Sequence, residues 1–122
     1  LAILAAKKQA ALVHAIDNNE WAFKNAAENV VKNGFPQIKV EQGDAALLKN
    51  RSYNLILANI NKNILLDDIA TYYGSLAPNG RIFFSGFYEN DLEDIRSHAE
   101  SIGLKYMNHR SKNQWVAAVF QK

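Results

Sequence analysis

The sequence predicts an α/β fold in which a mostly parallel sheet ends in an antiparallel hairpin. Short apolar runs, typical of buried strands, alternate along the chain with longer segments whose apolar residues recur at helical spacing. The last two apolar runs follow each other with only a polar turn between them. Strands separated by helices pair in parallel through right-handed crossovers, whereas strands joined by a short turn form a hairpin.

The first part of the chain is expected to form a helix, a strand and a second helix. Residues 1–9 are apolar and alanine-rich and end in lysines, which suit the negative end of a helix dipole. The run 12–16 is apolar like a buried strand, and the polar residues 17–19 supply turn and N-cap chemistry. Apolar residues at helical spacing predict a helix over 20–32, with Asn33-Gly34 as its C-terminal cap.

The middle of the chain continues the alternation. A short strand is expected over 37–41, followed by a turn at Gly43-Asp44 and a single helical turn over 45–49. The run 53–58 is strongly apolar and predicts a buried strand, and the next helix is expected over 63–76. The remaining elements are a Pro-Asn-Gly turn at 78–80, a strand over 81–87, an acidic amphipathic helix over 91–102, and strands over 104–109 and 115–120 around a turn at 110–114.

Length and composition fit one globular domain and exclude several classes of function. The chain has 122 residues and a formal net charge of +2, too small to indicate nucleic acid or an anionic membrane as a partner. No apolar run reaches about 18 residues, so no membrane span is expected. The absence of cysteine excludes disulfides and thiolate chemistry, and the three histidines lack the spacing of metal ligands, so no metal site is predicted.

Four polar segments follow four successive predicted strands. Ligands of open parallel sheets bind beyond the carboxyl ends of the strands, so these segments are candidates for one binding site. They are residues 17–18, 43–45, 59–61 and 85–87.

Each candidate has a structural interpretation beside the functional one. The two carboxylate oxygens of Asp17 match the vicinal hydroxyls of a ribose, but Asp17 could equally cap the following helix. Asp44 could accept a hydrogen bond from an exocyclic amine such as that of adenine, or form an ordinary turn. Asn59 presents an amide donor and acceptor at a strand end, or bonds its own loop backbone.

Several segments resemble known methyltransferases. Residues 13–22, 26–29 and 33–34 resemble the second strand and following helix of class I S-adenosylmethionine-dependent methyltransferases, which have a Rossmann-like sheet. The stretch Leu55-Ile56-Leu57-Ala58-Asn59-Ile60 is similar to the fourth-strand motif of the PrmA family, which methylates the ribosomal stalk-base protein L11. Residues 76–81, 85–87 and 113–116 are also similar to that family.

The resemblance implies a partial catalytic domain over residues 1–122. The chain begins with Leu1 rather than Met, and residues 1–6 match the helix that follows the glycine-rich loop of the family. We therefore expect the first strand and that loop, which would hold the methionine part of the cofactor, to be missing from this chain. In the class I fold the missing strand lies between the strands that end at Asp17 and Asn59, so the sheet should be interrupted there.

The resemblance also implies roles for the cofactor-binding residues. S-adenosylmethionine is the expected cofactor. Asp17 would hold its ribose hydroxyls, with Asn18 beside the adenine. Asp44 and the backbone of Ala45 would meet the adenine edge.

The implied reaction is direct methyl transfer to an amine, with Asn59 beside the methyl and the acceptor amine and Ile60 packing nearby. The expected acceptors are lysine side chains or the N-terminal amine of L11, a cytoplasmic protein substrate, with neither a membrane nor nucleic acid as a partner. Asn61-Lys62 departs from the small residues that are common in the family. A glutamine-amide or nucleobase methyltransferase remains an alternative, although it usually has prolines after the asparagine. A non-enzymatic Rossmann-like nucleotide-binding module is the other alternative.

Overall fold

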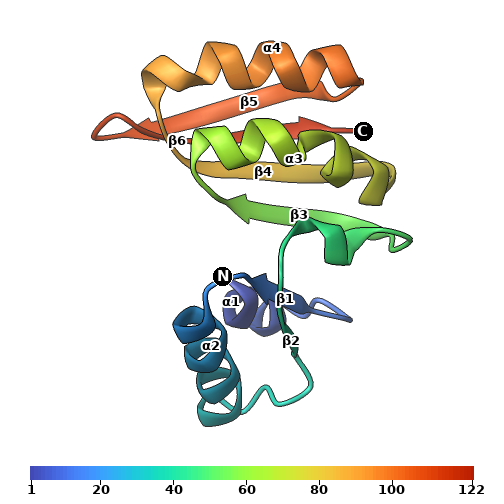
Figure 1. The fold of residues 1–122 in the computed structure, drawn as a ribbon, viewed down its shortest axis with the longest axis vertical. Coiled ribbons are helices and arrows are strands. Elements are labelled where there is room, and N and C mark those ends of the chain that lie inside the picture. The colour runs from blue at the N-terminus through green and yellow to red at the C-terminus, as the bar shows by residue number, and fades with distance from the viewer. The chain divides into compact units, whose positions relative to one another are not determined.

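A computed structural model describes residues 1–122, which form two compact units (Figure 1). The N-terminal unit is Leu1–Leu47 and the C-terminal unit is Leu48–Lys122. The elements of the first are α1 (Ala2–Lys7), β1 (His14–Asp17), α2 (Glu20–Lys32), β2 (Lys39–Gln42) and the start of η1, a short 3-10 helix (Ala45–Leu48).

The N-terminal unit is a two-stranded parallel sheet with helix α2 in contact with both strands. Asp17, the last residue of β1, lies opposite Gln42, the last residue of β2. The side chain of Asn19 caps α2 by accepting the N–H of Ala22 at 3.0 Å, as its residue type predicts. Gly34 follows the helix with φ of +80°, which glycine adopts without strain.

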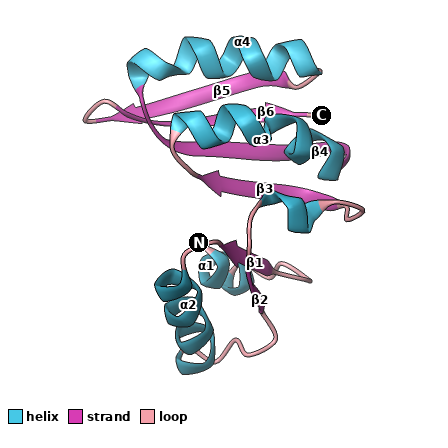
Figure 2. Ribbon diagram, viewed as in Figure 1, coloured by secondary structure: helices cyan, strands magenta, loops and turns pink.

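The C-terminal unit is a four-stranded sheet in the order β3-β4-β6-β5 (Figure 2). Strand β3 (Tyr53–Asn59) pairs in parallel with β4 (Leu76–Tyr88). The pairs of β4 with β6 (Trp115–Gln121) and of β6 with β5 (Lys105–Lys112) are antiparallel. The predicted combination of a parallel crossover and a closing hairpin is therefore confirmed.

Two helices cover one face of this sheet. Figure 1 shows α3 (Lys62–Ser75) and α4 (Leu92–Ile102), which follows the short η2 (Glu89–Asp91), on the same side. Their apolar faces and the inward-pointing strand residues form the core, in which the Tyr72 and Phe84 rings lie 6.3 Å apart. The largest fully buried side chains are Phe84, Phe87, Phe120, Leu65, Ile69, Ile82 and Ile95.

The other face of the sheet is open. Leu55 is 48% exposed and Leu57 is 39% exposed, and both alternate along β3 with residues that face the helices. Asn59 follows Leu57 by two residues on β3, so its side chain points to the same open face. A candidate site residue therefore lies at the end of this face. None of the helices combines the length and the apolar content needed to cross a bilayer.

The predicted turn at 110–114 is wrong in its extent. Strand β5 continues through Arg110 to Lys112, and only Asn113 and Gln114 form the turn. Both have positive φ, 51° and 69°, which is the backbone that a two-residue hairpin turn demands. The polar residues 110–112 therefore belong to an exposed edge strand rather than to a loop.

Two other boundaries differ from prediction. The turn residues 78–80 lie inside β4, where Tyr53 pairs with Leu76 and Leu55 already pairs with Arg81, so the residues between bulge out of the ladder. Asn79 takes a positive φ of 64° in this bulge, which explains the turn-like sequence. At the other end of the chain, Leu12 is 96% exposed and precedes β1 rather than belonging to it.

The expected interruption of the sheet is present. Strand β1 pairs only with β2, and β3 pairs only with β4, so the two strands belong to different sheets. No strand of residues 1–122 pairs with both. The expectation that no strand of residues 1–122 joins the strands ending at Asp17 and Asn59 is therefore confirmed.

Candidate functional site

Asp17 lies at the carboxyl end of β1, and one of its oxygens organises the turn into α2. Its Oδ1 accepts the backbone N–H of Asn19 at 2.9 Å, and its backbone carbonyl accepts the N–H of Gly43 at 3.0 Å. The side chain is exposed. The helix-cap interpretation of Asp17 is therefore wrong, because Asn19 is the N-cap of α2 and Asp17 Oδ1 stabilises the turn before it, while Oδ2 makes no hydrogen bond.

Asp44 lies two residues after the end of β2, in the turn before η1. Its Oδ1 accepts the N–H of Ala46 at 2.9 Å, which starts η1 in the same way that Asp17 starts the turn before α2. Asn18 and Gln42 connect the two strand ends, because the Gln42 side chain donates to the Asn18 carbonyl at 3.5 Å. The N-terminal unit therefore brings residues 17–18 and 44–45 together at one edge of its sheet, as the strand-end rule predicts.

Asn59 ends β3 in the C-terminal unit and is held by the neighbouring strand. Ser85 Oγ donates to Asn59 Oδ1 at 3.3 Å, and the Ile60 N–H donates to the Ser85 carbonyl at 3.1 Å. The side chain of Asn59 therefore bonds β4 rather than its own loop. By contrast, Asn61 is a helix cap, since its Oδ1 accepts the N–H of Ile64 at 3.1 Å.

Gly86 makes the close approach between these strands possible. It has φ of +91° and lies in a β-bulge between Ser85 and Phe87. A Cβ atom at this position would lie 2.7 Å from Asn59 Oδ1 and 3.1 Å from the Ile60 nitrogen. A side chain at residue 86 would therefore displace Asn59, and glycine is required here. A glycine at a predicted strand end was the signal in the sequence for this bulge.

A hollow of about 850 Å³ opens beside Asn59. It lies within the C-terminal unit, between the ends of β3 and β4 and the hairpin of β5 and β6. Its lining residues are Asn59, Ile60, Asn61, Ser85, Gly86, Arg110, Ser111, Lys112, Trp115, Val116 and Ala117. The hairpin residues among them were missed from the sequence, because their position depends on strand pairing.

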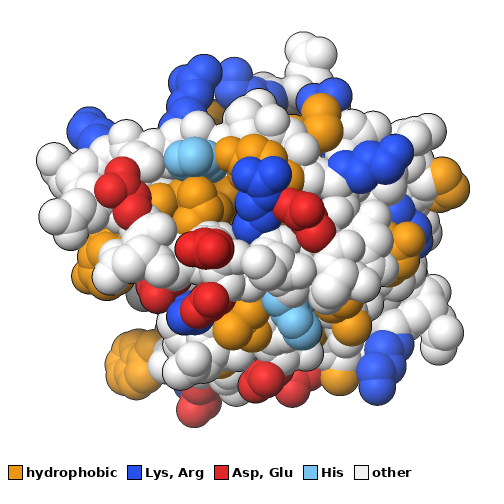
Figure 3. Space-filling view, turned by 90° about the horizontal axis from the view of Figure 1, so that it is seen from above, with side chains coloured by type: hydrophobic (Ala, Val, Ile, Leu, Met, Phe, Trp, Pro, Cys, Tyr) orange, Lys and Arg blue, Asp and Glu red, His pale blue; other side chains and the backbone are white.

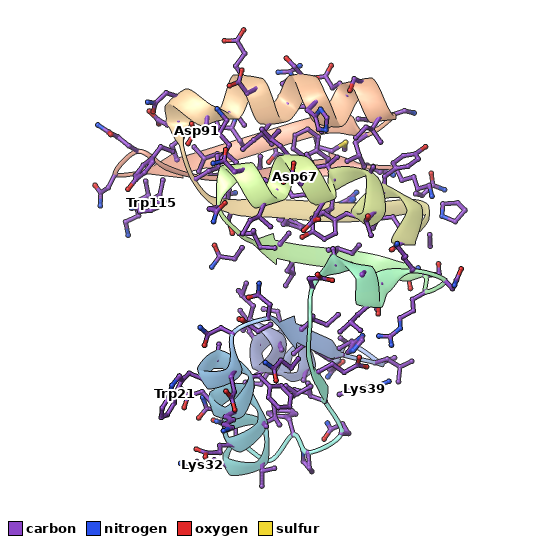
Figure 4. All side chains as sticks on the ribbon, viewed as in Figure 1. Trp21, Lys32, Lys39, Asp67, Asp91 and Trp115 are labelled. Atoms are coloured by element: carbon purple, nitrogen blue, oxygen red, sulfur yellow. The ribbon has the colours of Figure 1, made fainter.

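The hairpin wall of the hollow is cationic and aromatic. Arg110 and Lys112 are exposed and form no ion pair, and the lining contains no aspartate or glutamate. Trp115, at the hairpin end of the sheet in Figure 4, is 50% exposed and stacks on Tyr88 with ring centroids 4.3 Å apart. This local excess of positive charge differs from the face drawn in Figure 3, where acidic, basic and hydrophobic side chains are interspersed.

Lys62, next to the hollow, is held by carboxylates of η2 and α4. Its Nζ lies 2.7 Å from Asp94 Oδ2 and 3.5 Å from Asp91 Oδ1; Figure 4 shows Asp91 at the start of α4. The hydrogen bond to Asp94 is the main cause that raises the pKa of Lys62 above its usual 10.5. Lys62 is therefore protonated near neutral pH and does not serve as a base.

A family model and curated relatives match this chain to the same protein family. The model of the family described as "Ribosomal protein L11 methyltransferase (PrmA)" matches residues 1–122. A protein named ribosomal protein L11 methyltransferase from Phocaeicola vulgatus is 46% identical over 121 residues, and one from Bacteroides fragilis is 43% identical; each match covers 98% of this chain. The chain spans only 43% of the length of each relative.

Solved structures of methyltransferases also resemble this chain. The ribosomal protein L11 methylase of Lactobacillus delbrueckii subsp. bulgaricus superposes with a TM-score of 0.90 at 28% identity, covering 98% of this chain and 62% of that one. A methyltransferase from Pyrococcus furiosus shares the fold with a TM-score of 0.84 at 17% identity, covering 99% of this chain and 68% of that one. The predicted class I methyltransferase fold is therefore confirmed.

Proposed function

Because the chain belongs to the ribosomal protein L11 methyltransferase (PrmA) family, we propose that the full-length protein methylates amino groups of ribosomal protein L11 with S-adenosylmethionine. The acceptors in this proposal are lysine side chains or the N-terminal amine. The observation that carries it is the side chain of Asn59, fixed by Ser85 and Gly86 at the mouth of a hollow. A protein of the same fold, the N-methyltransferase NodS of Bradyrhizobium japonicum, was solved with S-adenosyl-l-homocysteine, which supports the choice of cofactor.

Acceptor oxygens at the strand ends of the N-terminal unit support the proposed binding of adenosine. Vicinal ribose hydroxyls are donors, and the Oδ2 atom of Asp17 is an exposed acceptor beyond the end of β1. In the proposal Asn18 lies beside the adenine, and Asp44 and the backbone of Ala45 meet its edge. Asp17 and Asp44 each use Oδ1 for their own turn, so each turn orients the remaining carboxylate oxygen of its aspartate.

S-adenosylmethionine supplies a sulfonium methyl group, and the protein positions the amine that takes it. As the new N–C bond forms, the S–C bond breaks, and the amine must be neutral so that its lone pair is available. Asn59 cannot remove a proton near neutral pH. Its carbonyl oxygen accepts one bond from Ser85 and has a second lone pair for an amine N–H. In the proposal this bond aims the amine lone pair, with Ile60 packing beside it, and positioning provides the rate enhancement.

A pair of variants of the full-length protein tests these assignments. Asn59→Ala should lower the turnover number roughly 100-fold, because positioning is lost, with little change in cofactor Kd. Asp17→Asn keeps the Oδ1 acceptor for Asn19 but removes the charge, and should weaken cofactor binding roughly tenfold or more. Transfer of labelled methyl groups to purified L11 measures turnover, and calorimetry measures cofactor Kd.

Different outcomes would contradict the proposed role of Asn59 and the proposed methyl transfer to L11. If Asn59→Ala lost turnover and cofactor affinity equally, its role in positioning the amine would be disproved. If the unaltered full-length protein transferred no label to L11, the proposed function would be wrong. Transfer to a nucleobase or to a glutamine amide instead would select the alternative methyltransferase.

A further inference from the structure

The hollow beside Asn59 has two cationic side chains on one wall and no carboxylate in its lining. Asn59, Ser85, Ala117 and Arg110 form a single row across the sheet, since Asn59 pairs with Ser85, Ser85 with Ala117, and Ala117 with Arg110. Paired residues point to the same face of a sheet, so Arg110 shares the open face with Asn59. Lys112 lies two residues further along β5 and therefore has the same orientation.

No carboxylate forms an ion pair with these two residues. Neither Arg110 nor Lys112 forms an ion pair, and β3, β4 and β6 contribute only uncharged residues to the lining. Glu89, Asp91 and Asp94 are acidic residues of the neighbouring η2 and α4, and no ion pair joins them to Arg110 or Lys112. Asp91 and Asp94 bind Lys62, and Glu89 joins the hairpin through its backbone N–H, which donates to the carbonyl of Gln114 at 2.9 Å. His109 is hydrogen-bonded to Tyr106 and precedes the cationic pair.

We propose that Arg110 and Lys112 lower the pKa of the acceptor amine in the hollow, so that it binds in the neutral form that can accept a methyl group. This inference rests on the proposed function. A lysine side chain has a pKa of about 10.4 in water, so almost all of it is ammonium at neutral pH. A like charge nearby disfavours the charged form, so two cations on the wall of the hollow favour loss of the amine's proton to solvent.

The same charges oppose the transfer step only in part, because transfer moves one positive charge from sulfur to nitrogen without adding a charge. A neutral amine and a sulfonium together carry one positive charge, and so do the methylated ammonium and the thioether that they become. The number of charges in the hollow is therefore unchanged by the reaction, whereas an ammonium acceptor would add one more. The cationic wall thus discriminates between the two protonation states of the acceptor before the reaction.

The expected size of the effect follows from distance and solvent. Arg110 lies three strand spacings of about 4.8 Å from Asn59 at the backbone, and its long side chain shortens that gap. Charges about 8–10 Å apart in an open, hydrated site interact weakly, so the pair together should lower the amine pKa by about 0.5–1 unit. Salt at 1 M reduces the screening length to about 3 Å and should remove most of this shift.

The test measures the rate of methyl transfer to purified L11 as a function of pH, using the full-length protein at saturating cofactor and acceptor. The double variant Arg110→Gln with Lys112→Gln should raise the apparent pKa of kcat by about 0.5–1 unit, because kcat reports the bound complex. At pH 7 its rate should fall by up to about 3- to 10-fold, and on the high-pH plateau it should be no lower than the unaltered rate, because transfer places positive charge on the amine. The apparent pKa of kcat/KM, where the free acceptor titrates, should not move.

Two controls make the outcome specific. The double variant Arg110→Lys and Lys112→Arg keeps both positive charges. Its pH profile of kcat should match that of the unaltered protein. Lys105→Gln removes a charge from the same strand outside the hollow and should leave the pKa of kcat in place. Matching melting temperatures of all variants would exclude a folding defect.

Three results would overturn the proposal. They are a rate loss of equal size at every pH, a rise in KM without a shift of the kcat profile, and a shift that persists in 1 M salt. Each would assign the two cations to acceptor contact or to structure instead. Failure of the proposed function would be seen separately, as an absence of transfer by the unaltered protein on its high-pH plateau.

Discussion

The N-terminal unit and the C-terminal unit both end their parallel strands in polar residues, yet they bury very different amounts of side chain. In the N-terminal unit, only Val30 and Ile38 are buried hydrophobic residues; all the others belong to the C-terminal unit. The two-stranded sheet of the N-terminal unit therefore buries little apolar surface. In the C-terminal unit, four strands and two helices enclose a core.

The difference affects how the candidate site residues are held. Asp17 and Asp44 are positioned by hydrogen bonds to backbone groups two residues along the chain. Asn59 is positioned by a neighbouring strand, through Ser85 and the close contact with Gly86. The proposed cofactor side is therefore organised locally, and the proposed acceptor side is organised by the packing of the sheet.

The largest expected effect tests the difference in the cores. Phe84→Ala removes a fully buried ring that contacts Phe120 at 5.3 Å between centroids, and should lower the free energy of unfolding by about 4 kcal/mol. Val30→Ala removes two methyl groups and should cost about 1.5 kcal/mol. Denaturant unfolding of the full-length variants measures both values. A loss for Phe84→Ala no larger than that for Val30→Ala would contradict the tight packing of Phe84 in the larger core.

A smaller loss of stability is expected when either of two glycines with positive φ is replaced by alanine. Gly86→Ala should cost about 3 kcal/mol, because a Cβ would collide with Asn59 in addition to the backbone strain. Gly34→Ala meets no atom within 4 Å and should cost only the backbone term of about 1 kcal/mol.

Turnover separates these two variants further. Gly86→Ala should also lower methyl transfer, since it moves Asn59, while Gly34→Ala should leave transfer intact. Melting curves and the labelled-methyl assay provide the two readouts. A fully active Gly86→Ala enzyme would show that the close contact does not position Asn59.

The smallest effect should be the same in both units. Asn19→Ala and Asn61→Ala each remove one helix cap, with bonds of 3.0 and 3.1 Å, and each should cost about 1 kcal/mol. A cap bond is local, so its contribution should not depend on the size of the core beneath it. Thermal unfolding measures the loss, and Asn→Asp at each position, which keeps the acceptor oxygen, should restore the stability. A cost confined to one unit would show that capping depends on the surrounding core.

The features that sequence predicted well are local ones. Apolar spacing within a segment determines whether it forms a helix or a strand, and Asn19 is a cap by residue type. The strand-end rule selected Asp17 and Asp44, which lie at one edge of the two-stranded sheet, and Asn59, which ends β3 in the other sheet. Their roles in binding and transfer remain predictions.

The features that sequence missed depend on distant partners. Arg110 and Lys112 look like loop residues, since β5 is an edge strand with exposed polar side chains. Their place on the wall of the hollow follows from pairing with Ala117 and Trp115, which no short-range pattern reveals. Leu76 illustrates the same limit, because its pairing with Tyr53 extends β4 across a bulge that reads as a turn.

The hydrogen bond from Ile60 to Ser85 has a consequence for the chemical ageing of the protein. Asparagine side chains deamidate when the next backbone nitrogen attacks their carbonyl carbon, and a flexible Asn-Gly pair reacts most readily. At Asn59 the following nitrogen is committed to the carbonyl of Ser85, and the branched side chain of Ile60 hinders its approach. Asn79 is exposed, has positive φ and precedes Gly80. Asn33 is likewise exposed and precedes Gly34. Storage damage should therefore begin at these two Asn-Gly pairs, while the amide at the end of β3 keeps its neutral form.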